Sequence, residues 1–166
     1  MQRLAPFAFL LVLFASSAGA EDPPAPTRLL TDNVGILKSS EVKELERMLS
    51  AIEKYELAKA IVYIDRAVPP SETLEAYTLR LASAWKVGDA NRDDGIVIFV
   101  FVDDRRMRIE VGLGLEEVLT NDEARNIIDN KLKPAFRDGR FAQGLASALQ
   151  SMAQVLDVGR ARARRP

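Results

Sequence analysis

The sequence GIVIFVFVDDRRMRIEVGLG, at Gly95–Gly114, contains the clearest strand signal in the chain. Every residue from Ile96 to Val102 is β-branched or aromatic, and a run this short without helical periodicity is typical of a strand covered on both faces. After an Asp-Asp-Arg break, apolar and charged residues alternate from Met107 to Val111, which indicates a strand with one buried face. We therefore predict an antiparallel hairpin whose first strand lies at the buried centre of a sheet.

A short strand and a helix precede this hairpin. Ala60–Ile64 is apolar and β-branched, which predicts a second buried strand. The helix between it and Ile96 is long enough for a right-handed βαβ unit, so the two strands should be parallel. The predicted fold class is therefore α/β: a three-layer α/β/α sandwich with a small mixed sheet, built from a βαβ unit and an antiparallel hairpin.

Helical periodicity predicts four helices around these strands. The first follows Ser39-Ser40, and the third follows the capping box Thr120-x-x-Glu123 and should end at Pro134. The apolar stripes of the four helices lie within Val42–Ile52, Leu74–Trp85, Ala124–Leu132 and Leu145–Leu156.

Residues 1–20 have the organisation of a secretory signal peptide. Arg3 supplies a positive charge, Phe7–Phe14 an apolar core, and positions 18–20 a small-residue cleavage site. A membrane anchor is the alternative, but this core is shorter than the roughly 20 apolar residues that a spanning helix needs. We predict cleavage near Ala20, a mature chain that begins at Glu21, a periplasmic or secreted location, and no transmembrane segment after cleavage.

Three segments should follow the signal peptide. Residues 21–28 form a Pro-rich leader that we interpret as a tether, and residues 29–157 form one domain. Residues 158–166 form a basic tail, which we interpret as a solvated terminus, although its arginines could also contact anionic lipid or a partner.

Cysteine and histidine are both absent from the chain. This excludes thiol nucleophiles, histidine bases and the usual zinc sites, so a metal ion would have to be held by oxygen. Such ligands suit the hard ions Ca²⁺, Mg²⁺ and Mn²⁺. The net charge of −1 provides no field that would recruit nucleic acid. Gly112-x-Gly114 lacks a third glycine because Glu117 takes that position, so no nucleotide site is expected.

Several motifs occur in sequence order: Asp32–Leu37, Trp85-x-Val87-Gly88, Asp94-Gly95, Asp104–Ile109, Gly112–Glu116, and Lys133–Arg137 with Gly139. Together they resemble the TPM domain family, over roughly Leu29–Leu156. That resemblance implies an exported α/β/α domain. Relatives include a thylakoid-lumen protein associated with photosystem II repair and reported as an acid phosphatase, an accessory subunit of a ligand-gated channel, and many bacterial proteins of unassigned role. It also implies Ca²⁺ binding through acidic loops, which makes Ca²⁺ the first choice of ion, with Mg²⁺ or Mn²⁺ behind it.

The first candidate metal site lies at the carboxyl ends of the parallel strands. The predicted topology brings Asp32, Asp65, Asp103 and Asp104 to this end, where open α/β sheets usually bind ligands. We predict Asp32, Asp103 and Asp104 as ligands. The alternative is that these acids only form turns, and the neighbouring arginines of residues 105–108 could neutralise them without a metal.

A rival candidate lies at the opposite end of the sheet. Asp89–Gly95 begins like an EF-hand loop, but its glycine comes one residue late and Val100 replaces the final glutamate, so a full EF-hand is excluded. Glu116 should return to this end and could complete a site with Asp93 and Asp94. A solvated loop is the alternative.

Three functions are consistent with these features. The first is a binding or accessory module of an envelope or membrane protein complex, with a Ca²⁺-type site. The second is a metal-dependent phosphatase that works through carboxylates alone. The third is a structural domain that calcium stabilises. We place the module first because no pair of nucleophile and base is recognisable.

Overall fold

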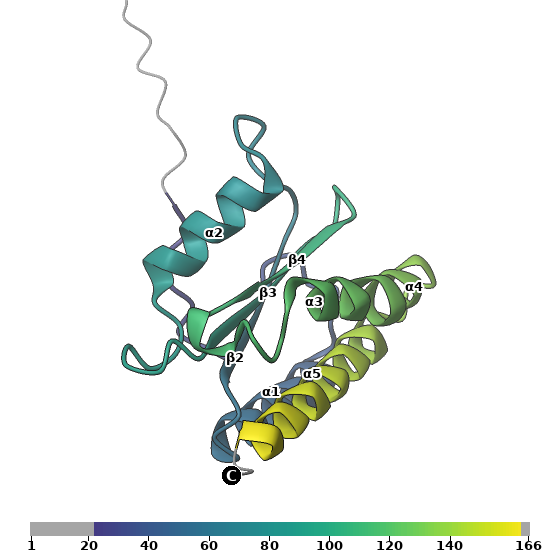
Figure 1. The fold of residues 1–166 in the computed structure, drawn as a ribbon. Helices are drawn as coiled ribbons and strands as arrows, with labels where there is room; N and C mark the ends of the chain where they lie inside the picture. The colour runs from purple at the N-terminus through teal and green to yellow at the C-terminus, as the bar shows by residue number, and fades with distance from the viewer. Residues whose placement is uncertain (1–21, 164–166) are drawn as a thin grey trace, which may run out of the picture.

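A computed structural model describes residues 22–163. The predicted signal peptide with its cleavage site and the last residues of the basic tail lie outside the described residues. Within the described range, one four-stranded sheet in the order β1-β2-β3-β4 has helices on both faces (Figure 1), which confirms the α/β fold. The elements are β1 (Leu30–Asp32), α1 (Ser39–Lys54), β2 (Lys59–Asp65), α2 (Leu74–Trp85), β3 (Gly95–Phe101), β4 (Arg106–Val111), the 3₁₀ turn η1 (Leu113–Leu115), α3 (Asn121–Ile127), the π turn η2 (Ile128–Leu132), α4 (Lys133–Arg137) and α5 (Phe141–Ala163).

The predicted hairpin consists of β3, an inner strand of the sheet, and β4, its neighbour at the edge. All seven residues of β3 are buried, as its unbroken apolar run predicts. β3 pairs in parallel with β2 and antiparallel with β4, so that Ile98 lies opposite both Val62 and Ile109. β4 consequently forms one edge of the sheet.

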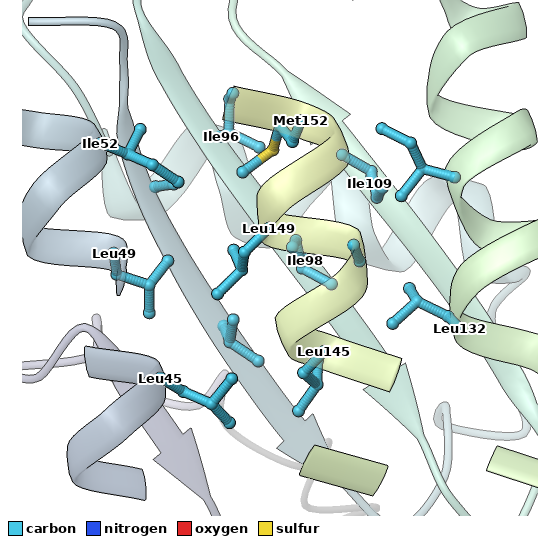
Figure 2. Close-up of a cluster of buried hydrophobic side chains, with 14 of the residues drawn as sticks. Leu45, Leu49, Ile52, Ile96, Ile98, Ile109, Leu132, Leu145, Leu149 and Met152 are labelled. Atoms are coloured by element: carbon cyan, nitrogen blue, oxygen red, sulfur yellow. The ribbon is translucent and has the colours of Figure 1, made fainter. Parts of the chain in front are cut away.

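Two hydrophobic cores lie on the two faces of the sheet. Figure 2 shows the larger one, where leucines of α1 and α5 pack over isoleucines of β3 and β4. The smaller core lies under α2, where Trp85 stacks on Phe99 with ring centroids 5.5 Å apart. The apolar stripes of the helices therefore bury both faces of β3.

β1 is a strand that the sequence analysis did not predict. It pairs in parallel with β2, and α1 connects the two. α1 connects β1 to β2 across one face of the sheet, and α2 connects β2 to β3 across the other face. Both connections move by one strand in the same direction, so the two crossovers have opposite handedness. Only one of them can follow the usual right-handed rule that the prediction assumed.

The prediction that Pro134 ends the third helix is wrong. Thr120 caps this helix as predicted, since its Oγ1 accepts the backbone N–H of Glu123 at 3.2 Å. The helical path then widens into the π turn η2 and continues through α4 to Arg137. Pro134 lies in the first turn of α4, where a missing N–H is tolerated.

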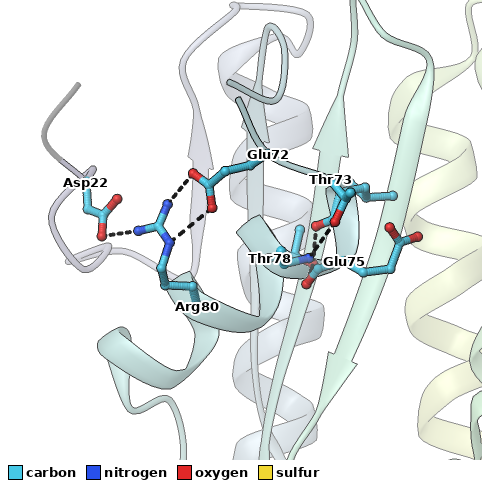
Figure 3. A network of polar contacts seen from close by, with 8 residues as sticks. Asp22, Glu72, Thr73, Glu75, Thr78 and Arg80 are labelled. Atoms are coloured by element: carbon cyan, nitrogen blue, oxygen red, sulfur yellow. Dashed lines mark hydrogen bonds and ion pairs between the residues drawn. The ribbon is translucent and has the colours of Figure 1, made fainter. Parts of the chain in front are cut away.

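The described parts of both terminal segments contact the domain, and Arg160 near the C-terminus pairs with Glu56 at 3.2 Å. Asp22 of the leader forms an ion pair with Arg80 of α2, and Arg80 also binds Glu72 at 2.6 Å (Figure 3). The indole N–H of Trp85 donates to the carbonyl oxygen of Pro23 at 3.1 Å, so the leader packs against α2 rather than forming a free tether. α5 continues to Ala163, so the described part of the predicted basic tail is helical. No helix among the described residues is long and apolar enough to cross a membrane.

Candidate functional site

The carboxyl ends of the strands bring acidic residues together at one end of the sheet, as the topology predicted. Asp32 ends β1 and lies in register with Ile64 of β2, which Asp65 follows. The hairpin turn joins them there, because the N–H of Asp103 donates to the carbonyl oxygen of Arg66 at 2.8 Å. These acids therefore share one end of the molecule, and what their carboxylates contact decides their role.

The carboxylate of Asp32 binds the backbone of the turn that leads into α1. Its Oδ1 accepts the N–H groups of Val34 and Gly35 at 3.1 and 2.8 Å. Its Oδ2 accepts the N–H of Leu37 at 2.9 Å. This is the turn-forming role that the sequence analysis gave as the alternative to a metal ligand.

The two hairpin acids also hold loops. Oδ2 of Asp104 accepts the N–H of Val68 at 2.8 Å, which fixes the segment between β2 and α2. The carboxylate of Asp103 lies 3.9 Å from the guanidinium of Arg66, at the surface. Within residues 22–163 there is no group of three or more acidic side chains spaced to hold a metal ion. Calcium binding at this end stays a prediction.

Asp65 belongs to a separate hydrogen-bonded cluster. Its Oδ2 accepts the phenolic O–H of Tyr63 at 2.8 Å, and the amide of Asn33 donates to the same phenolic oxygen at 3.0 Å. Burial raises the pKa of Tyr63 well above its ordinary value, and the hydrogen bond to Asp65 raises that pKa further. The cluster therefore keeps a neutral phenol beside a carboxylate.

A groove of about 1040 Å³ lies beside the edge strand β4, between α2 and the segment that follows β4. The loop between α2 and β3 and the turn η1 form its rim at the end of the sheet opposite Asp32. Leu79 of α2 and Leu113 of η1 line it and are 58% and 73% exposed. The charged residues that line it are Lys86, Asp89, Asp93, Arg108, Glu110, Glu116 and Asp122.

Glycines allow the two rim loops to touch backbone to backbone. The N–H of Gly112 donates to the carbonyl oxygen of Gly95 at 2.8 Å. A Cβ atom on Gly114 would lie 1.8 Å from the carbonyl oxygen of Arg92. The Gly112-x-Gly114 motif therefore serves close packing of two loops, which no side chain could replace.

The rival metal ligands are only partly brought together. Asp93 and Glu116 line the groove. Asp94 does not, because its buried carboxylate accepts the N–H of Asp89 at 2.8 Å through Oδ1 and pairs with Arg92 at 2.8 Å through Oδ2. Asp94 therefore stabilises its own loop, and Asp93 and Glu116 remain exposed to a ligand.

The groove carries an excess of negative charge. Arg108 is neutralised by Glu110, which its Nε contacts. Lys86 is the remaining basic residue on the lining. Four exposed carboxylates on the lining have no ion-pair partner within residues 22–163: Asp89, Asp93, Glu116 and Asp122.

The sequence analysis missed a polar contact beneath α2. The hydroxyl of Thr78, which is fully buried, donates to Oε1 of Glu110 at 2.6 Å. The alternation of β4 predicts a solvent-facing Glu110, whereas its side chain is only 11% exposed. Thr78 lies four residues after Leu74 and three before Leu81, which places it on the apolar stripe of α2. This position was the sequence signal for a buried polar contact.

The comparisons with known proteins agree with this architecture. The family model described as the TPM domain matches residues 30–155. The chain belongs to the TPM domain family. Comparison with curated proteins found no match.

Solved structures share the fold of this TPM domain. An NMR structure of the N-terminal domain of a protein from P. gingivalis is 33% identical, with a TM-score of 0.72, covering 80% of this chain and 84% of that one. The BA42 protein of Bizionia argentinensis is 20% identical, with a TM-score of 0.65 and coverage of 74% and 82%. The N-terminal domain of a Corynebacterium glutamicum protein is 15% identical, with a TM-score of 0.59 and coverage of 81% and 84%. The last two resemble this chain in fold alone.

Proposed function

We propose that this TPM domain is an exported binding module of a cell-envelope protein complex and that its partner occupies the groove beside β4. The observation that carries this proposal is the groove itself. It combines exposed leucines at positions 79 and 113 with an acidic rim and an edge strand. Exposed apolar side chains with a polar surround are typical of interaction surfaces.

The chemistry of the groove supports binding more than catalysis. A hydrolase usually places a nucleophile beside a base that a third group orients. In the groove, the one carboxylate that is nearly buried, that of Glu110, is held by Thr78 and Arg108, and the others are exposed. A phosphatase would have to act through these exposed acids and a divalent ion.

Residues 1–20 and the family resemblance support export. N-terminal sequencing of the protein from the envelope fraction of its host should find Glu21 as the first residue. A chain that retains Met1 in the cytosolic fraction would contradict the proposal.

Site-specific photocrosslinking tests the binding surface. A benzophenone amino acid at Leu113 should give a discrete crosslinked product with one envelope protein in intact cells. The same amino acid at Glu44, which is exposed on α1 across the sheet from α2, is the matched control and should give none. Equal crosslinking from both positions, or from neither, would show that the groove is not the binding surface.

Turnover of a generic phosphoester separates the module from a phosphatase. We expect no hydrolysis above a buffer blank with Ca²⁺, Mg²⁺ or Mn²⁺. Metal-dependent hydrolysis that is lost in Asp93→Asn with Glu116→Gln would favour the phosphatase instead.

A further inference from the structure

The free edge of β4 has backbone groups that pair with nothing in the described chain. β4 is the last strand of the sheet and pairs only with β3. The N–H of Gly112, directly after β4, donates to Gly95 across this pair. Because hydrogen-bonding direction alternates along an antiparallel strand, the residues of β4 that bond to β3 are Arg106, Arg108 and Glu110.

The other residues of β4 direct their N–H and C=O groups away from the sheet. Within residues 22–163, no hydrogen bond to another element satisfies these groups. β4 is six residues long and contains no proline, so its protection against an added strand comes from charged side chains, of which Arg108 and Glu110 already pair with each other. The outward residues are Met107, Ile109 and Val111.

The groove gives an added strand room along this edge. It is lined by residues 108–111 of β4 and by segments on either side of them, α2 and the chain from η1 into α3. The side chains of β4 alternate between these sides, with Ile109 in the larger core and Glu110 against α2. A strand added here would therefore need apolar residues on one face and polar residues on the other.

The charge of the groove selects the polar residues of such a strand. Four exposed acids line it, and among residues 22–163 Lys86 is the one basic residue on the lining without an ion-pair partner, so a basic segment would complement the groove and an acidic one would be repelled. Leu79 lies on α2, on the side of β4 that Glu110 faces, so the aliphatic stems of the basic residues would cover it.

We infer that the free edge of β4 docks an extended, basic polypeptide segment of the partner, which joins the sheet as a fifth strand. The inference rests on the proposed function, since it specifies the chemistry of the partner at the same groove. Backbone hydrogen bonds to Met107, Ile109 and Val111 supply the attachment, and alternating apolar and basic side chains supply the selectivity.

Amide hydrogen exchange tests this inference with an internal control. The probe is an eight-residue peptide of alternating valine and lysine with blocked termini, added in a chelator to the ¹⁵N-labelled mature chain. At saturation, the amides of Met107, Ile109 and Val111 should exchange at least about tenfold more slowly, whereas the alternate amides of β4, which β3 already protects, should change less. Uniform slowing along β4, or no slowing, would overturn the inference. If protection of the β4 amides rises with protein concentration in the absence of the peptide, a second copy of the chain occupies the edge, and the inference is also overturned.

Backbone methylation of the probe tests strand addition without altering its charge. Two versions carry N-methyl groups on either the valines or the lysines, so each blocks one edge of the peptide strand. One version should bind as the parent peptide does, and the other at least about tenfold more weakly. Equal affinities for the two versions would exclude a strand that bonds through one edge.

Charge variants complete the test. Asp93→Asn with Glu116→Gln should weaken peptide binding several-fold, whereas the control pair Glu44→Gln with Asp157→Asn, on the exposed sides of α1 and α5, should leave it unchanged. Equal weakening in both pairs would mean that the attraction is not local to the groove.

If Leu113 crosslinks to an envelope protein but β4 shows no protection, the proposed function stands and strand addition fails. If both experiments are negative, both fail.

Discussion

The backbone amide of Gly114 donates a hydrogen bond to the carbonyl oxygen of Asp93 across 3.1 Å. This bond joins the segment after β4 to the loop before β3, at the rim of the groove. Asp93 has a positive φ of 45°, which is uncommon for a residue other than glycine. The contact therefore holds a groove acid in a backbone conformation that it would rarely adopt alone.

Gly114→Ala should destabilise the domain. The added Cβ would lie 1.8 Å from the carbonyl oxygen of Arg92, so the two loops would have to separate. We expect the free energy of unfolding, measured with urea, to fall by about 1–3 kcal/mol. Leu113→Ala is the control, because this side chain is 73% exposed and its loss should change stability by no more than about 0.5 kcal/mol. Equal stabilities for the two variants would contradict this account of the loop contact.

Thr78→Val should also destabilise the domain, by about 1–3 kcal/mol in urea unfolding. Valine keeps the shape of the buried side chain but removes the hydroxyl that donates to Glu110 at 2.6 Å. The nearly buried carboxylate would then depend on Arg108 alone. Thr78→Ser keeps the hydroxyl and should lower the free energy of unfolding by less. A serine variant that is less stable than the valine variant would argue that packing dominates.

Strong local patterns were sufficient to predict most of the sheet. The unbroken apolar run of β3 and the alternation of β4 each reflect burial that the sequence records directly. β1 has only three residues, too few for any periodicity, and was missed. Proline normally ends a helix, and the π turn that makes room for Pro134 has no sequence signal of its own.

The candidate site was predictable only in outline. Strand order was enough to place Asp32 and Asp104 at one end of the sheet and Asp93 at the other. It could not show that the carboxylate of Asp32 binds three backbone N–H groups, because that depends on the exact path of the turn. Nor could it show that Asp94 is directed away from the groove, toward Arg92.

Tyr63 should make stability depend on pH in the alkaline range. Burial, followed by the hydrogen bond to Asp65, raises the pKa of this phenol above the value of about 10 that it has in the unfolded chain. The contribution of the neutral phenol to stability is therefore complete below about pH 10 and is lost as the pH rises from there toward the folded-state pKa. Urea unfolding at pH 8 and pH 11 should show a smaller loss of stability in Tyr63→Phe than in the parent. Burial also raises the pKa of Tyr77, so part of the loss should remain.

Calcium should raise the melting temperature of the purified mature chain. Exposed carboxylates that line one groove repel one another, and an ion that binds only the folded state would relieve this repulsion. The stabilisation would be roughly 2.7 kcal/mol at a hundredfold excess over the dissociation constant. The measurement is calorimetric melting of metal-free protein with and without Ca²⁺.

Two substitutions identify which end of the sheet binds the ion. Asp104 already accepts the N–H of Val68, whereas Asp93 and Glu116 line the groove without an ion-pair partner among the described residues. We therefore expect Asp93→Asn to abolish the calcium shift and Asp104→Asn to retain it. The reverse result would assign the ion to the carboxyl ends of the strands, with Asp32 and Asp103 as the other ligands. If the parent shows neither heat of binding nor a shift, both groups of acids are turn and loop residues, and partner binding at β4 must proceed without an ion.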